Sequence, residues 1–158
     1  MERNRHSLRA SILDRLVDTD PGVSREPVPF RLVSIGQIKG AVIRDLENLL
    51  NSRRCIVHPP EALEELNASL FVYGLKDHTS HNPKSPAARQ QLRLDIERTV
   101  SLFEPRLRNV SVQFEAPAPG ERSLKFRITA TLVIEPIAEP VTFDTFFDVQ
   151  KGEWTISR

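Results

Sequence analysis

The last third of the chain alternates apolar and polar residues, and this alternation limits the possible folds more than any other feature. Three stretches, residues 110–114, 124–134 and 141–150, place apolar side chains at every second position, with Thr145 as the exception. A period of two predicts β-strands with one buried and one solvated face, as in antiparallel sheets. Because the buried face must be covered, we expect an α+β fold. Helices pack on one face of a small antiparallel sheet, with the strands concentrated in the C-terminal third.

Two earlier segments have the period of an amphipathic helix and can supply that cover. Ser34 is a suitable N-cap for the first segment, whose apolar residues recur every three or four positions as far as Leu50. The second segment starts at Ser85-Pro86, a cap followed by a proline, and it ends at Pro105. We expect both helices to lie against the apolar face of the sheet.

The length and the proline content predict one domain that follows an arm. The chain has 158 residues, which suits a single domain with its own core. Residues 1–33 contain a short amphipathic stretch followed by Pro21, Gly22, Pro27 and Pro29, a composition that favours a loop. We therefore expect an N-terminal arm and proline-rich linker over residues 1–33 and one domain over residues 34–158.

Charge and composition exclude several classes of function. The formal net charge is +1 and acidic residues are interleaved with basic ones, so we expect no nucleic-acid partner. No apolar run approaches the roughly 20 residues of a membrane span, and we expect no membrane insertion. Cys55 is the only cysteine, which rules out a disulfide within the chain and favours the cytoplasm. His78 and His81 fall in a polar loop, and we expect no metal and no cofactor.

Four segments, in order along the chain, resemble the TssE-like family of type VI secretion baseplate proteins. The most informative is the end of the first helix, with its paired arginines. The other three are an N-terminal element, a tyrosine–glycine segment and a Glu-Pro-Arg motif that a contractile-phage baseplate wedge protein shares. The matching residues are Asp45, Leu46, Glu47, Leu49, Leu50, Asn51, Ser52, Arg53 and Arg54, with residues 11–16, then Tyr73, Gly74, Leu75 and Asp77, and finally Glu104, Pro105 and Arg106.

This resemblance implies a structural subunit without catalytic activity. Such a protein sits in the baseplate wedge, contacts the wedge subunits TssF and TssG, and offers its C-terminal sheet as a template for the contractile sheath. The alternative is a lysozyme-like peptidoglycan or glycoside hydrolase, because the related phage protein carries that label. Glycoside hydrolysis needs two carboxylates with separated pKa values, and the candidates Asp95, Glu97 and Glu104 all lie on or at the end of one helix.

Two groups of charged residues are candidate contacts for the wedge subunits. Pro105 ends the second helix and forces a turn, so we expect Glu104 and Arg106 to project from a fixed corner. The alternative is an internal ion pair between these two side chains. Arg53 and Arg54 follow the first helix, where an interaction with the helix dipole alone would explain their charge.

The third expected strand is the candidate contact for the sheath. It runs from Val141 to Gln150, between an expected loop at residues 136–140 and a break at Lys151-Gly152. As the last strand of a meander it would lie at a sheet edge, where partners can add a strand. On its polar face Phe146 lies between Asp144 and Asp148, an aromatic side chain in a charged rim. Alternatively, a bulge turns Phe146 into the core.

Overall fold

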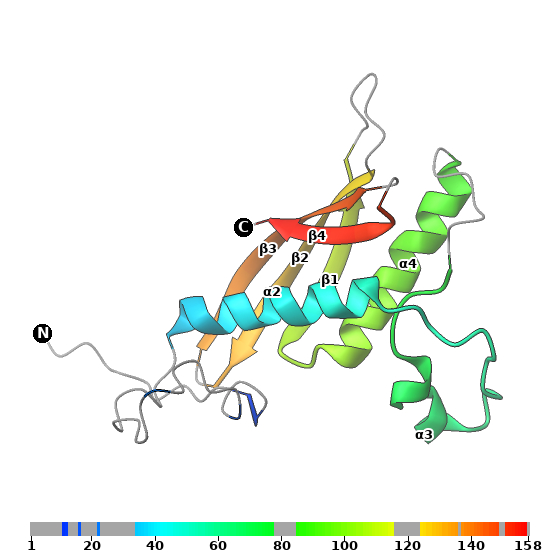
Figure 1. Ribbon diagram of the computed structural model, residues 1–158, viewed down its shortest axis with the longest axis horizontal. Helices are drawn as coiled ribbons and strands as arrows, with labels where there is room; N and C mark the ends of the chain where they lie inside the picture. Colours follow the sequence, from blue (N-terminus) through cyan, green and yellow to red (C-terminus); the bar gives the residue numbers. More distant parts are fainter. Residues whose placement is uncertain are drawn as a thin grey trace, which may run out of the picture.

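The computed structural model has helices and a four-stranded antiparallel sheet whose order follows the sequence (Figure 1). It describes residues 11, 12, 16, 22, 34–77, 85–115, 124–135, 137–148 and 151–157. The helical elements are α2 (Ile35–Asn51), α3 (Glu64–Asn67), the 3₁₀ turn η2 (Leu70–Val72) and α4 (Pro86–Phe103). The strands are β1 (Leu107–Phe114), β2 (Leu124–Ile134), β3 (Ile137–Asp148) and β4 (Glu153–Ser157).

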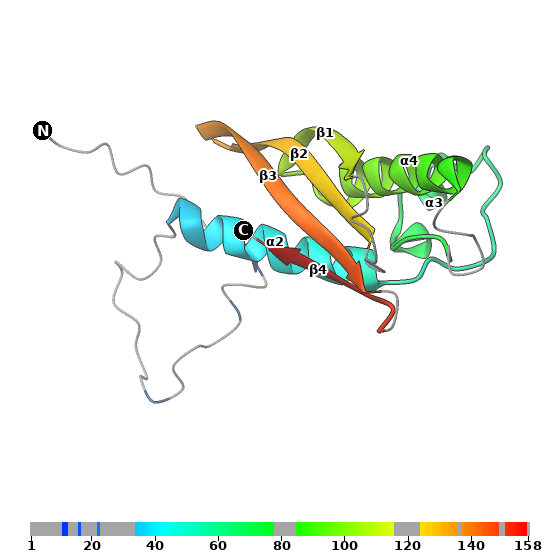
Figure 2. The ribbon, with the colours of Figure 1, turned by 90° about the horizontal axis from the view of Figure 1, so that it is seen from above.

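The helices α2 and α4 cover one face of the sheet, and no other described helix or strand covers the opposite face, called the open face below (Figure 2). The core lies between these layers, and its members come from both helices and all four strands. Fully buried examples are Val42, Leu46, Ile96, Val100, Phe126 and Ile128. The predicted α+β class, with helices on one face of an antiparallel sheet, is confirmed.

Local signals in the sequence explain where the two long helices begin and end. The Ser34 hydroxyl accepts a hydrogen bond from the Gln37 backbone, and the Gln37 side chain accepts one from the Ser34 backbone, which is a complete capping box. The second helix starts at Pro86 and stops at Phe103, two residues before Pro105. Both helices lie where the sequence predicted them, although α2 ends at Asn51, before the paired arginines.

The strand β3 begins earlier than predicted, because a proline is tolerated where the sheet has no further neighbour. Residues 137–140 pair with β2 instead of forming a loop, and Pro140 lies opposite Thr131. On the other side of β3, the strand β4 reaches only from Asp148 back to Asp144. At Pro140 no strand lies on that side, so the missing N–H leaves no ladder hydrogen bond unfilled.

A fourth strand that the sequence did not predict follows the turn at Lys151-Gly152. Gly152 has φ +68°, a backbone conformation that suits glycine. The strand β4 is short, but Trp154 is buried and packs edge-on against Phe126. Because β4 pairs with the outer side of β3 from Asp144 to Asp148, the expectation that Val141–Gln150 forms a sheet edge is wrong over these five residues.

Side chains from the helices cover backbone groups on both outer strands. On β4, the side-chain oxygen of Asn51 accepts a hydrogen bond from the backbone N–H of Trp154 (2.7 Å), and the side-chain nitrogen of Asn51 donates one to the backbone carbonyl oxygen of Trp154 (2.9 Å). The Glu47 carboxylate accepts the backbone N–H of Ile156 (2.9 Å). On β1, the carboxylate of Glu97 accepts the N–H of Val112 (2.8 Å). These bonds occupy groups that a partner strand would otherwise use, which protects both edges.

Several predicted features fall on residues that the structure does not describe. In the predicted arm, Ile12 and Leu16 are exposed, and the division into an arm and a domain over residues 34–158 stays a prediction. His78, His81 and Gln150 lie outside the described residues. Within the described part of the chain, none of the helices is both long and apolar enough to cross a membrane.

Candidate functional site

The Glu-Pro-Arg segment forms the corner between α4 and β1. The Glu104 backbone N–H bonds the carbonyl oxygen of Val100, and the Glu104 carbonyl oxygen accepts the N–H of Leu107 (3.0 Å). These bonds close the end of α4 and start β1 within three residues. Pro105 is exposed, whereas the side chain of Glu104 is only 4% exposed. The corner therefore fixes a carboxylate in the interior.

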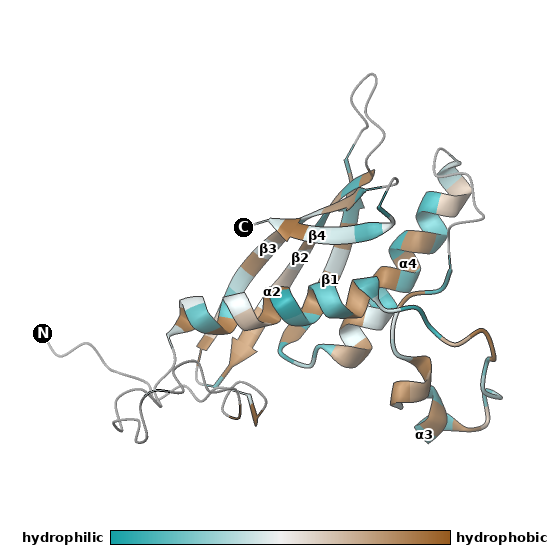
Figure 3. Cartoon of the chain, in the orientation of Figure 1, coloured by the Kyte–Doolittle hydropathy of each residue, from teal (hydrophilic) through white to brown (hydrophobic). Residues whose placement is uncertain are grey.

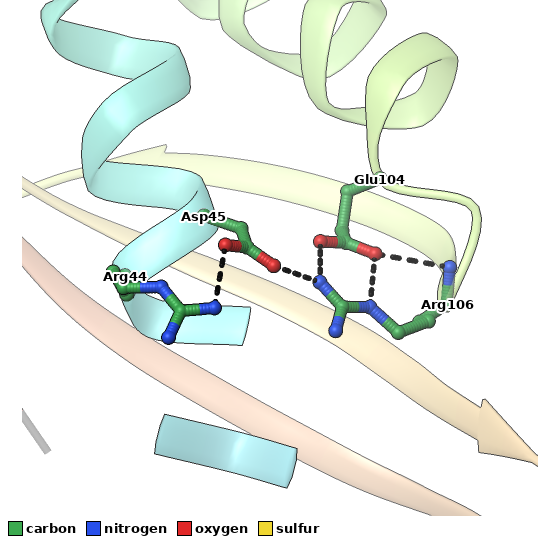
Figure 4. Close-up of polar contacts among 4 residues, drawn as sticks. All are labelled: Arg44, Asp45, Glu104 and Arg106. Carbon is green, nitrogen blue, oxygen red and sulfur yellow. Dashed lines mark hydrogen bonds and ion pairs between the residues drawn. The ribbon is translucent and has the colours of Figure 1, made fainter. Parts of the chain in front are cut away.

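Arg106 binds this carboxylate and a second one from α2 (Figure 4). Its Nε donates to Glu104 Oε1 (2.6 Å), and its Nη2 donates to Glu104 Oε2 and to Asp45 Oδ2 (2.6 Å). Arg44 donates to the other oxygen of Asp45 (3.2 Å). The cluster joins residues 61 positions apart in the sequence and locks the helix α2 onto the corner.

The geometry of this cluster supports the internal ion pair and corrects the expectation for Glu104. Its carboxylate faces Arg106 and Asp45 instead of projecting outward. Arg106 keeps about a quarter of its side chain exposed (26%), so part of the guanidinium is accessible. The hydrogen bond to Glu104 raises the pKa of Arg106 above its usual range, and Asp45 adds to this effect.

Tyr73 lies beside the cluster, and burial and the two carboxylates raise the pKa of its phenol above 10.0. Burial is the largest cause, followed by the negative charges of Asp45 and Glu104. The folded state therefore holds this proton more tightly than the unfolded chain does. The protonated phenol therefore favours the folded state over the unfolded chain. This contribution to the free energy of unfolding is fully present below pH about 10 and is lost as the pH rises through the pKa of the folded state.

This shift can be measured directly, because the chain has one tyrosine. We expect the phenolate absorbance of the folded protein to appear with a midpoint above pH 10.0. Asp45→Asn should lower that midpoint, since it removes one of the two negative charges. Circular dichroism at each pH must show that the chain stays folded. A midpoint at or below that of free tyrosine would contradict the placement of Tyr73.

The two paired arginines have different environments. Arg53 is 71% exposed, and only a long contact of 3.7 Å joins it to Asp77. Arg54 is 9% exposed and pairs with Asp95 on α4 (3.1 Å). It also donates to the hydroxyl of Thr99 (2.6 Å).

The chain segment after η2 packs tightly against the end of α2 and receives Arg54. Residues Arg53 and Leu75 form an isolated β-bridge, and the Arg54 side chain donates to the Gly74 carbonyl oxygen (3.0 Å). Gly74 has φ +94°, and a Cβ atom there would lie 2.4 Å from the Ser52 carbonyl oxygen. Only glycine fits this approach. Arg54 therefore joins the end of α2 to the segment around Gly74 and to α4. An interaction with the helix dipole alone does not account for these contacts.

On β3, Phe146 points to the open face of the sheet. Residues Val141, Phe143 and Thr145 are buried on the inner face, and the alternation continues through Phe146 without a bulge. The alternative in which Phe146 turns inward is therefore wrong. Lys125 of β2 lies 5.7 Å from the centre of the Phe146 ring, in a cation–π contact.

Asp144 and Asp148 share this open face, and Asp144 belongs to a chain of charges across the strands. Arg127 binds Asp144 (2.7 Å) and Glu115 (3.0 Å). The hydrogen bond to Asp144 raises the pKa of Arg127, with Glu115 adding a smaller effect. These ion pairs are exposed, so they contribute little to stability and can exchange with charges on a partner.

Five polar residues hold the fold together through contacts that the sequence did not predict. Asp45 binds Arg106, and Glu47 and Asn51 bind the backbone of β4. Asp95 and Thr99 both bind Arg54. Glu47 and Asn51 are four residues apart on α2 and therefore share a face, which was a usable signal. No pattern in the sequence indicated which strand they would meet.

The three candidate carboxylates of the hydrolase alternative are engaged in structural contacts. Glu104 binds Arg106, Asp95 binds Arg54, and Glu97 accepts from Arg93 (2.8 Å) and from the backbone of β1. Among the described residues, no three His, Cys, Asp or Glu side chains group to hold a metal ion. The geometry therefore does not favour the hydrolase alternative.

Comparisons with known proteins identify one family. The model of the family described as "Baseplate wedge protein gp25" matches residues 37–137, which is more than half of the chain. No curated protein sequence matches this chain. A chain in the solved structure "The baseplate complex from the type VI secretion system" is similar, with 19% sequence identity and a TM-score of 0.47. The similarity covers 70% of this chain and 94% of that chain.

Proposed function

The chain belongs to the family of baseplate wedge protein gp25, and on this basis we propose that it is a structural subunit of a type VI secretion baseplate. It binds the wedge subunits TssF and TssG and acts as a template for sheath assembly through its C-terminal sheet. In this proposal the protein works in the cytoplasm and needs no cofactor and no nucleic acid. The observation that carries the sheath contact is the open face of the sheet.

That face has the features of a protein-binding surface. Phe146 is partly exposed between charged side chains, and Lys125 holds its ring in place. Because β4 covers β3 from Asp144 to Asp148 and helix side chains bond both outer strands, docking around Phe146 uses the side chains of this face. It does not use strand addition along Asp144–Asp148. An aromatic anchor surrounded by exchangeable ion pairs is typical of an interface hot spot.

The wedge subunits contact the opposite layer in this proposal. Arg53 extends into solvent at the end of α2, while Pro105 and the accessible part of Arg106 form the surface of the corner. Arginine is enriched at protein interfaces because its planar fork binds carboxylates in two bonds. Glu104 and Arg54 act indirectly, by holding these residues in place.

We expect Phe146→Ala to block sheath polymerisation on purified baseplates while the isolated protein stays folded. Loss of the cation–π contact should lower the free energy of unfolding by about 1 kcal/mol or less. Phe143→Ala, which empties a buried position on the same strand, should instead cost about 3–5 kcal/mol. Both stabilities are measured by urea denaturation.

A matched control lies on the same face of β3. Thr142 is exposed and lies four residues before Phe146 on β3, so Thr142→Ala should leave sheath assembly unchanged. Asp144→Arg places a like charge beside Arg127 and should impair assembly as Phe146→Ala does. Normal sheath assembly on baseplates that carry either folded variant, Phe146→Ala or Asp144→Arg, would move the docking surface elsewhere.

A further inference from the structure

A basic hollow lies beside the C-terminal half of α4, on the helical side of the sheet. It has a volume of about 180 Å³, and the residues that line it include Arg54, His58, Lys76, Arg98 and Leu102. Glu61 is the one carboxylate in this lining. The hollow therefore combines three fixed positive charges with a single negative one.

Two of these cations, Lys76 and Arg98, have no ion-pair partner within the described part of the chain, whereas Arg54 pairs with Asp95. The side chains of Lys76 and Arg98 form no hydrogen bond and no ion pair with any described residue, and neither does Glu61. The hydrogen bonds of Arg54 use Nε and Nη2, which leaves Nη1 without an acceptor among those residues. Cations that converge on one hollow favour an anionic group from another molecule.

Exposed apolar side chains lie on a chain segment that contributes to the wall of the hollow. The segment from Cys55 to Val72 forms part of its wall, and it exposes five large apolar residues. Ile56 (92% exposed) and Leu70 (80% exposed) are the extreme cases. The five are Ile56, Val57, Leu63, Leu70 and Phe71. Figure 3 shows this hydrophobic colouring around α3, away from the sheet, and the helix α3 contributes no buried residue.

From this combination we infer that the hollow and its apolar rim are a docking surface for a partner protein segment in which acidic and apolar side chains alternate. A carboxylate enters between Lys76 and Arg98, and apolar side chains cover Ile56, Val57 and Leu102. A small anion alone would satisfy the charges but would leave the apolar rim in water, which is unusual for a patch of this kind. The surface is separate from the open face of the sheet, so this inference does not depend on sheath docking.

The test is a selection of peptides from a random library displayed on phage, against the full chain. We expect the selected peptides to combine acidic with apolar residues. The double variant Lys76→Glu/Arg98→Glu should bind them at least about tenfold more weakly, because like charges then face each other. Ile56→Asp should have a similar effect. All three positions lie at exposed side chains, so the variants should keep the unfolding midpoint of the unmodified chain.

A charge-matched control separates the hollow from the net charge. Arg108→Glu/Lys151→Glu changes two exposed cations elsewhere and should retain full peptide binding. The inference is overturned if no selected peptide depends on Lys76 and Arg98, or if the selected peptides lack acidic residues. It is also overturned if inorganic phosphate binds with this dependence and no peptide does.

Discussion

Arg106→Ala is expected to destabilise the protein by about 3–5 kcal/mol, the usual cost of removing one partner of a buried ion pair. Glu104 is 4% exposed and would be left in the interior without its arginine partner. Asp45 would lose its bond to the corner, so the helix α2 would be held less firmly. Urea denaturation measures the change, and an unchanged slope would show that the same surface unfolds.

Two variants separate loss of the ion pair from loss of an arginine. Arg108→Ala removes an exposed arginine two residues away and should change the stability by no more than about 0.5 kcal/mol. Glu104→Gln/Arg106→Met should recover part of the loss, because no unpaired charge is then buried at position 104. Equal stabilities for Arg106→Ala and Arg108→Ala would show that the cluster does not hold the corner.

The double variant also separates folding from docking. If Glu104→Gln/Arg106→Met folds but does not bind TssF and TssG, the accessible part of Arg106 takes part in the wedge contact. If it folds and binds normally, the Glu-Pro-Arg motif acts only by stabilising the corner. With Glu104 and Arg106 projecting outward, as we expected from the sequence, Arg106→Ala would instead abolish binding without affecting the fold.

Arg54→Ala is expected to cost a similar amount, about 3–5 kcal/mol. Arg54 and Asp95 are 9% and 8% exposed, so the pair is more deeply buried than the corner cluster. The substitution also removes the donor to the Gly74 carbonyl oxygen and to Thr99. The segment around Gly74 should loosen first, and hydrogen exchange of the Leu75 amide, which bonds Ser52, should become faster.

Arg53→Ala is the matched control, because the two arginines are neighbours in the sequence. Arg53 is 71% exposed, and its contact with Asp77 is long, so its loss should change the stability by less than about 0.5 kcal/mol. If the two alanine variants unfold at the same urea concentration, Arg54 does not join α2 to α4. A loss of wedge binding in Arg53→Ala alone would support the role proposed for its exposed side chain.

The sequence by itself determined the local elements and the class of fold. The capping box at Ser34, the start of α4 at Pro86 and the period of two in β2 depend on interactions within a few residues. Those interactions are present whatever the rest of the chain does. The four motifs in their order were also sufficient to indicate the family, and the family model confirms it.

The tertiary structure alone decided which side chains meet. Nothing within Glu104-Pro105-Arg106 indicates that Asp45 of α2 completes the cluster, because that contact spans 61 positions. The strand β4 was missed since five residues carry too little alternation, and it forms because α2 supplies hydrogen bonds to its outer side. Arg53 and Arg54 are equivalent in sequence, and only the approach of Gly74 and α4 buries one and leaves the other in water.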